Sequence, residues 1–214
     1  LTAILCLGDS HFGGSGPLGD EAFFLGVAVL TAVGVGAEDE RAVLRVDVVH
    51  DWRRDAERGG GALYDMGVYP INAARYATGM EPVAVTGRTW SERDEIYSEV
   101  PEFAEFTLEF PGGVTATGTA SFGASMNYLK VECTEGGYQL RPFQAYSGVQ
   151  GTTSDGTRLP PDPADQQARQ MDNDARAIKN DNPPLVPGRE GLADVRVVRA
   201  IMESSANDGA RMEL

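Results

Sequence analysis

The sequence predicts an α+β domain built on an open, mainly antiparallel sheet with helices on one face. Segments in which apolar and polar residues alternate, the pattern of a half-buried strand, follow one another through the middle of the chain. A helix-like segment precedes these strands, and two segments with an apolar stripe follow them. Strands grouped in this way form one layer, and the helices before and after them cover one of its faces.

The composition excludes several classes of protein. The chain has 214 residues, of which 42% are hydrophobic, enough for one core or for one domain with an appendage. The net charge of −14 would repel nucleic acid and anionic membranes. The longest apolar run without a charge, residues 22–37, is too short for a confident membrane span. Cys6 and Cys133 match neither a disulfide framework nor a metal-binding knuckle, so we expect a cytoplasmic protein without a metal site.

The N-terminal segment differs from the rest, because Arg41 is the first basic residue of the chain. We therefore divide the chain into an unassigned segment, residues 1–41, and a domain, residues 42–214. The sequence GSGPLG at residues 14–19 fits the G-x-G-x-x-G pattern of a dinucleotide-binding turn. However, Pro17 removes a backbone N–H that such a loop would direct at a pyrophosphate, so a chance glycine-rich loop is the favoured interpretation.

The elements of the domain follow in order. Residues 42–50 alternate as a strand does, and the charged loop DWRRDAERGGG comes next. A helix is expected over residues 63–78, bent or restarted at Pro70, with Gly79 as its C-terminal cap. Further strands are expected at residues 82–90, 103–110, 113–122 and 128–135, with a hairpin turn at residues 111–113 and another hairpin at TEGGYQLRPF.

The chain is expected to close with two helices, after a polar connection at residues 148–163. Each helix has an apolar stripe with helical spacing. The stripe of the first contains Ala164, Ala168, Met171, Ala175 and Ile178, and that of the second contains Leu192, Val195, Val198, Ile201 and Met202.

Asp65 and Tyr69 are the candidate site residues. They lie four positions apart in a predicted helix, so their side chains share a face. A phenol beside a carboxylate can handle the proton of a carbonyl or alcohol group. The alternative is structural, with a glycine-rich helix entry in which Asp65 caps the helix and Tyr69 is half-buried. Spacing alone favours the structural alternative.

Several motifs that occur in order along the chain favour the functional interpretation of Asp65 and Tyr69 over the structural one. The run DWRRD, then GGGALYDMGVYPINAARYATG and EPVAV, resembles the C-terminal domain of the Gfo/Idh/MocA oxidoreductases, of the glucose–fructose oxidoreductase type. The similarity continues through SFGASMNYLKVECTEGGYQL to the closing segment NDNPPLVPGREGLADVRVVRAIMESSANDGARMEL. It covers roughly residues 51–214.

The resemblance implies the substrate-binding and oligomerisation domain of an NAD(P)-dependent sugar or polyol oxidoreductase. In that family a Rossmann domain holds NADP or NAD, and the open sheet face forms a homo-oligomer. Asp65 and Tyr69 fall on the family's D-x-G-x-(His/Tyr) positions. By resemblance, Tyr69 would transfer the hydroxyl proton and Asp65 would bind sugar hydroxyls. Trp52 and Arg53, in the entering loop, are expected to be structural only.

The sequence also departs from the family. It has no Glu-Lys-Pro motif, and its two lysines, Lys130 and Lys179, lie in a predicted strand and a predicted helix. Hydride transfer and cofactor binding by this chain alone are therefore not expected. Residues 1–41 resemble nothing in the family, which suggests a Rossmann remnant, a partial gene or a shifted reading frame. The alternatives to a catalytic role are a non-catalytic module that binds a sugar or dimerises, and a gene fragment without independent function.

Overall fold

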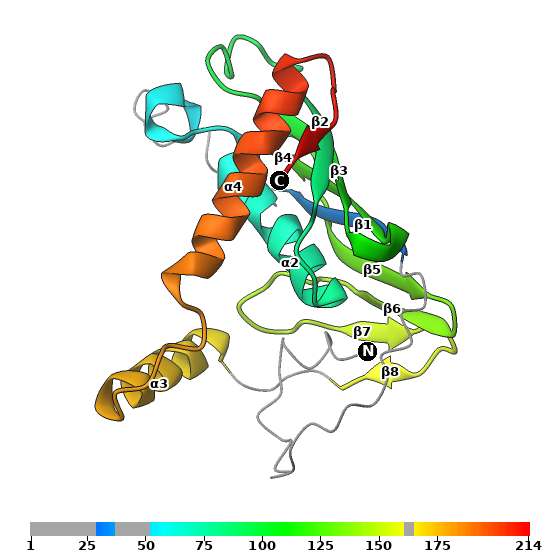
Figure 1. The fold of residues 1–214 in the computed structure, drawn as a ribbon, viewed down its shortest axis with the longest axis vertical. Coiled ribbons are helices and arrows are strands. Elements are labelled where there is room, and N and C mark those ends of the chain that lie inside the picture. The colour runs from blue at the N-terminus through cyan, green and yellow to red at the C-terminus, as the bar shows by residue number, and fades with distance from the viewer. Residues whose placement is uncertain (1–28, 37–51, 161–164) are drawn as a thin grey trace.

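The computed structural model describes residues 29–36, 52–160 and 165–214. In these ranges one sheet has the strand order β8-β7-β6-β5-β1-β4-β3-β2-β9 (Figure 1). Its strands are β1 (Val29–Gly36), β2 (Ala84–Trp90), β3 (Phe103–Glu109), β4 (Thr115–Ser121), β5 (Asn127–Cys133), β6 (Gly136–Leu140), β7 (Gly151–Thr153), β8 (Arg158–Leu159) and β9 (Met212–Glu213). The described pairs are antiparallel except β1 with β4, which is parallel. The predicted α+β fold class is confirmed.

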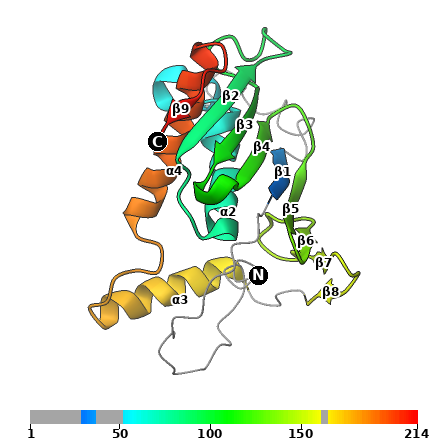
Figure 2. The ribbon, with the colours of Figure 1, turned by 45° about the vertical axis from the view of Figure 1, so that its right-hand side comes forward.

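Helices cover one face of this sheet. The helical elements are a π-turn (Leu63–Gly67), α2 (Val68–Thr78), α3 (Gln166–Lys179) and α4 (Gly188–Ala206), with short 3-10 turns at Trp52–Arg54, Ala56–Arg58 and Pro111–Gly113. Figures 1 and 2 show α2 and α4 on the same face of the sheet, with no described helix on the other. None of the described helices is both long and apolar enough to cross a bilayer.

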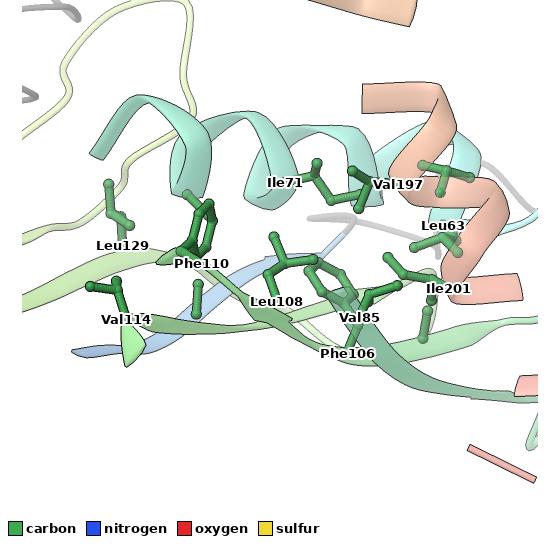
Figure 3. Close-up of a cluster of buried hydrophobic side chains, with 14 of the residues drawn as sticks. Leu63, Ile71, Val85, Phe106, Leu108, Phe110, Val114, Leu129, Val197 and Ile201 are labelled. Atoms are coloured by element: carbon green, nitrogen blue, oxygen red, sulfur yellow. The ribbon is translucent and has the colours of Figure 1, made fainter. Parts of the chain in front are cut away.

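The core lies between the sheet and these two helices. Ile71 of α2 and Ile201 of α4 point at Leu108 and Phe106 of β3 (Figure 3). The alternation in β3 sends these apolar side chains inward and leaves Thr107, between them, on the other face. Small residues make room for the large ones, because a Cβ at Gly118 of β4 would lie 2.2 Å from the ring of Phe106. The two strands therefore interlock in one register.

A buried cation joins α2 to α4. Arg75 of α2 is 5% exposed, and its guanidinium donates to Asp194 of α4 at 2.7 Å, to Glu190 of α4 at 3.0 Å and to Glu81 at 2.7 Å. The amide of Asn72 donates to the other oxygen of Asp194 at 3.0 Å. A buried charge is tolerated only when it is paired and hydrogen-bonded, and this network meets both conditions. It fixes α2 along α4.

The network couples stability to pH in two directions. The hydrogen bond from Arg75 lowers the pKa of Glu81, so this carboxylate stabilises the fold above its unfolded pKa, and its contribution is lost as the pH falls through the folded value. Burial raises the pKa of Asp194, against the opposing effect of Arg75. A raised carboxyl pKa favours the folded state at low pH, and that contribution is lost as the pH rises through the folded pKa.

Most predicted elements are present, with differences at the edges of the sheet. The residues expected to form a polar connection at 148–163 include β7 and β8, and the unpredicted β9 pairs with β2. These strands are two or three residues long, too short for an alternating pattern to reveal them. The predicted Gly79 cap is confirmed, with a φ of 65° and an N–H that donates to the carbonyl of Arg75.

Two predictions about the helices need correction. The helix over residues 63–78 changes from π-helical to α-helical geometry at Gly67, where the π-turn ends, and not at Pro70. Pro70 fits the first turn of α2, because no N–H is needed there. The apolar stripe of α3 does not enter the core, since Met171 and Ile178 are exposed.

Other predictions concern the N-terminal part of the chain. The strand at residues 42–50 and the glycine pattern at residues 14–19 lie outside the described residues. Strand β1 belongs to the segment we left unassigned, and its backbone pairs with both β4 and β5. The boundary at residue 42 stays a prediction.

Replacing Arg75 with Met is expected to destabilise the fold by about 3–5 kcal/mol at pH 7, because Asp194 remains buried without its cationic partner. The deficit should shrink as the pH falls below 7, since the raised pKa of Asp194 favours its neutral form. Urea unfolding over a series of pH values, followed by circular dichroism, measures this. The control is Arg176→Met, which removes an exposed ion pair with Asp172 and should cost less than about 1 kcal/mol. Equal losses in the two variants would contradict a special role for Arg75.

Candidate functional site

The two candidate residues lie on one continuous helical segment. Asp65 is in the π-turn, and Tyr69 follows in the first turn of α2. The predicted spacing of one helical turn is therefore present. Single-turn π segments are rare and occur frequently at functional sites. Tyr69 is 42% exposed, so its hydroxyl is accessible, whereas the side chain of Asp65 is only 21% exposed.

Asp65 is held by a residue that we expected to be only structural. The Nε of Arg53 donates to Oδ2 of Asp65 at 2.9 Å, and the guanidinium of Arg53 also lies 4.9 Å from the centre of the Trp52 ring. Asp65 does not cap a helix, because residue Ala62 occupies the N-cap position of the π-turn. The capping role considered for Asp65 is therefore wrong, whereas the glycine-rich helix entry is present. Arg53 fixes the orientation of this carboxylate from outside the helix.

The three glycines before the helix allow this contact to form. Gly59 and Gly61 have φ values of 75° and 99°, in the region that favours glycine. Gly60 packs against backbone, since a Cβ there would lie 2.6 Å from the carbonyl oxygen of Arg53. The N–H of Gly61 donates to that same oxygen at 2.7 Å. The glycines thus bring the loop that carries Arg53 against the start of the helix.

A second loop, residues 91–102, closes one side of this region. Its anchor is Glu102, which is 1% exposed and accepts hydrogen bonds from the backbone N–H groups of Glu92 and Arg93 and from Nε of Arg93. The N–H of Ala62 donates to the carbonyl of Pro101 at 3.0 Å. The loop is therefore tied to the entry of the helix that carries Asp65.

Beyond Tyr69, the next turn of α2 contacts α4. Asn72, one turn further along α2, donates to Asp194 of α4 as described above. The candidate site is thus a helix face held on three sides: by Arg53 and the glycines, by the loop at residues 91–102, and by α4. Such a face offers a carboxylate that accepts hydrogen bonds and a phenol that can donate or accept one. This is suitable chemistry for a ligand rich in hydroxyl groups.

The glycine run at residues 59–61 does not fit a dinucleotide. A pyrophosphate site requires glycine N–H groups that are open to the ligand. Here the space beside Gly60 is filled by the backbone of Trp52 and Arg53, and the N–H groups of Gly60 and Gly61 donate to carbonyls of the chain itself. Within the described ranges there is also no group of three His, Cys, Asp or Glu residues that could hold a metal ion.

The sequence indicated Asp65, Tyr69 and the importance of the glycines, but not the role of Arg53. The signal for Arg53 was available only as a charged residue in DWRRD. Twelve positions separate it from Asp65, so no helical or strand spacing relates the two. The roles proposed for Asp65 and Tyr69 in catalysis stay predictions.

Gly60→Ala is expected to destabilise the protein by about 1–3 kcal/mol, because the added Cβ would meet backbone atoms that cannot move cheaply. Thermal unfolding of the purified chain measures this. The matched control is Gly191→Ala in α4, where an added Cβ meets no atom within 4 Å. That control should be neutral or stabilising by up to about 1 kcal/mol. A Gly60→Ala variant as stable as the Gly191→Ala variant would show that this close approach is unimportant.

Comparison with known proteins identifies the fold. Residues 40–139 match the family model described as the GFO/IDH/MocA C-terminal domain. A D-xylose 1-dehydrogenase [NADP(+)] of Haloarcula marismortui is 33% identical over 167 residues, which are 73% of this chain and 45% of the relative. A D-xylose 1-dehydrogenase (NADP(+)) 2 of Haloferax volcanii is 30% identical over 175 residues, 78% of this chain and 52% of the relative.

A solved structure agrees with these relatives. The aldose-aldose oxidoreductase of Caulobacter crescentus, crystallised with glycerol, superposes with a TM-score of 0.73 and 31% identity, over 87% of this chain and 55% of that one. The chain spans about half the length of the relatives that it matches. It belongs to the Gfo/Idh/MocA family and corresponds to the family's C-terminal domain.

Proposed function

We propose that this chain is the substrate-binding and oligomerisation domain of an NAD(P)-dependent sugar or polyol oxidoreductase. The observation that carries the proposal is the pair Asp65 and Tyr69 on one helix face, with Asp65 held by Arg53. The names of the relatives support the substrate class, since two of them are D-xylose dehydrogenases that use NADP.

In this proposal Asp65 binds and orients the substrate. An ionised carboxylate has about four acceptor sites, so Arg53 leaves room for hydrogen bonds from sugar hydroxyls. The Arg53 contact also restricts the rotation of Asp65, so that less entropy is lost when a sugar binds.

Tyr69 would hold and move one proton in the same reaction. Its exposed hydroxyl would accept the proton of the substrate hydroxyl when that carbon is oxidised, and would return it in the reverse direction. The cofactor takes the hydride and belongs to a separate dinucleotide-binding half, which the described residues do not provide. The chain by itself is therefore expected to position substrate without turning it over.

The main alternative is a non-catalytic module that binds a sugar or pairs with a copy of itself. A second alternative is a gene fragment without independent function. The oxidoreductase domain and the non-catalytic module both predict no saturable binding of NADP to the purified chain in isothermal titration calorimetry. They separate when the chain replaces the matching half of the Haloarcula marismortui relative. Turnover of a sugar by this chimera supports the oxidoreductase domain, whereas a folded chimera that binds NADP but has no activity supports the module. A poorly soluble or molten chain would support the fragment.

In the active chimera, Tyr69→Phe is expected to lower kcat by about 10²–10⁴-fold, because the variant loses the group that carries the proton. The unfolding temperature should change little, since the hydroxyl is at an exposed position. Steady-state kinetics with a sugar and NADP, together with thermal unfolding, measure both. Tyr146→Phe is the control, because Tyr146 is 77% exposed and lies outside the site. An unchanged kcat for Tyr69→Phe removes this residue from proton transfer.

The open sheet face supports the proposal of a homo-oligomer. No described helix covers it (Figure 2), and threonines of three neighbouring strands lie side by side on it, Thr86, Thr107 and Thr117. Nearby, Trp90 stacks on Phe103 with ring centres 5.1 Å apart. An uncovered face that carries small polar residues, an aromatic pair and the Arg88–Glu105 ion pair is suited to contact with a copy of itself.

Thr107→Arg combined with Thr117→Arg is expected to convert the oligomer to a monomer, because like charges would meet across a two-fold axis. Sedimentation velocity of the wild type and the variant measures this. Gln170→Arg, on the exposed surface of α3, carries the same kind of charge and should leave the oligomer intact. A monomeric wild type, or a variant that sediments like the wild type, contradicts the proposed interface.

A further inference from the structure

A buried carboxylate, Glu102, lies at the end of the loop that flanks the candidate site. It is 1% exposed, and its two oxygens have separate partners. Oε2 accepts hydrogen bonds from the backbone N–H groups of Glu92 and Arg93 at 2.9 and 3.0 Å. Oε1 accepts one from Nε of Arg93 at 2.7 Å and lies 2.6 Å from a second nitrogen of the same guanidinium. Glu102 therefore holds both the backbone of the loop and the side chain of Arg93.

Arg93 in turn contacts two aromatic residues. Its guanidinium donates to the carbonyl of Phe122 at 3.3 Å and lies 5.2 Å from the centre of the Tyr97 ring. The rings of Tyr97 and Phe122 stack with their centres 5.7 Å apart. A guanidinium is attracted to the face of an aromatic ring, and its planar shape favours one placement of both groups. Arg93 thus fixes an aromatic pair that comes from two separate segments of the chain.

This aromatic pair belongs to a small apolar cluster that contacts the turn carrying Asp65. The cluster contains Ala62, Ala120 and Phe122, with Met66 and Tyr97 packed against it, and it is separate from the main core. Ala62 precedes Asp65 by three positions, and Met66 follows it directly. The chain is therefore anchored in the cluster on both sides of Asp65, and the place of this carboxylate depends on the cluster.

A buried ion pair of this kind acts on geometry more than on stability. The cost of removing two charges from water offsets most of their attraction, so apolar side chains of similar size often give an equally stable fold. Charged hydrogen bonds, in contrast, have defined directions. The contacts that begin at Glu102 end at the turn that carries Asp65, so this turn is what they orient.

We propose that Glu102 is a positioning residue for the candidate site. It acts through Arg93 and the small cluster to hold Asp65 where this carboxylate can bind a sugar hydroxyl. The inference rests on the proposed function, because it takes Asp65 to be the group that binds the substrate.

The two candidate residues should respond differently when this contact is lost. Asp65 lies between two residues of the small cluster, whereas Tyr69 lies in α2, whose Ile71 is buried in the main core. A change at Glu102 should therefore weaken substrate binding more than proton transfer. In steady-state kinetics, the KM for the sugar rises and kcat changes little.

Glu102→Gln separates the two tasks of this side chain. The amide oxygen can still accept the backbone N–H groups, but the NH2 group would face the guanidinium of Arg93, donor against donor. Amide hydrogen exchange of the whole purified chain needs no activity. It is expected to become about tenfold faster or more at residues 62–66, and to change less than about twofold in β3. In the active chimera, KM should rise about tenfold or more while kcat falls less than about threefold.

Val131→Ala is the control for a general loss of stability, because Val131 is buried in the main core on β5. It should lower the unfolding temperature but leave KM, and exchange at residues 62–66, within about twofold of wild type. Arg93→Met tests the same contact from its other side and should reproduce the effects of Glu102→Gln. The double variant should be no worse than Arg93→Met alone, since both substitutions act on one contact.

Wild-type exchange at residues 62–66 in Glu102→Gln overturns the inference, as does a loss of kcat with an unchanged KM. Additive effects in the double variant would show that Glu102 does not act through Arg93, and equal effects in Val131→Ala would reduce its role to general stability. Each of these results also overturns the inference. An inactive wild-type chimera would reject the proposed catalytic role, whereas faster exchange confined to residues 62–66 would still identify Glu102 as the residue that positions this turn.

Discussion

The buried guanidinium of Arg75 is the contact on which the positions of the other elements depend. It lies between α2 and α4 and is paired with Asp194, Glu190 and Glu81. Apolar packing of these helices on the sheet supplies the larger part of the stability, but it is not directional. The charged hydrogen bonds have defined geometry, so they select one orientation of α2 along α4. The candidate site is positioned by this pair of helices.

The site itself depends on close backbone packing. Gly60 allows the loop at Trp52–Arg54 to lie directly against the beginning of the helical segment. Arg53 then reaches Asp65 across twelve positions of sequence. In this arrangement the glycines act through the chain's own backbone, and their effect on a ligand is indirect. The π-turn adds to this by placing Asp65 and Tyr69 on one segment with a changed helical pitch.

Two surfaces of different chemistry remain open for partners. The uncovered sheet face carries threonines and a stacked aromatic pair. The exposed side of α3 that carries Met171 and Ile178 is apolar and is flanked by charges of both signs.

Local patterns in the sequence determined the strands at residues 84–133, the hairpin turn at Pro111–Gly113, the cap at Gly79 and the two candidate residues on one helical turn. Each of these depends on neighbours within a few positions, through period-two alternation, helical spacing or the φ of a glycine. The tertiary structure alone decided that Arg53 meets Asp65, that Arg75 is buried and that the apolar side of α3 faces outward. These outcomes depend on contacts between distant segments, and helical periodicity specifies an apolar side without specifying what covers it.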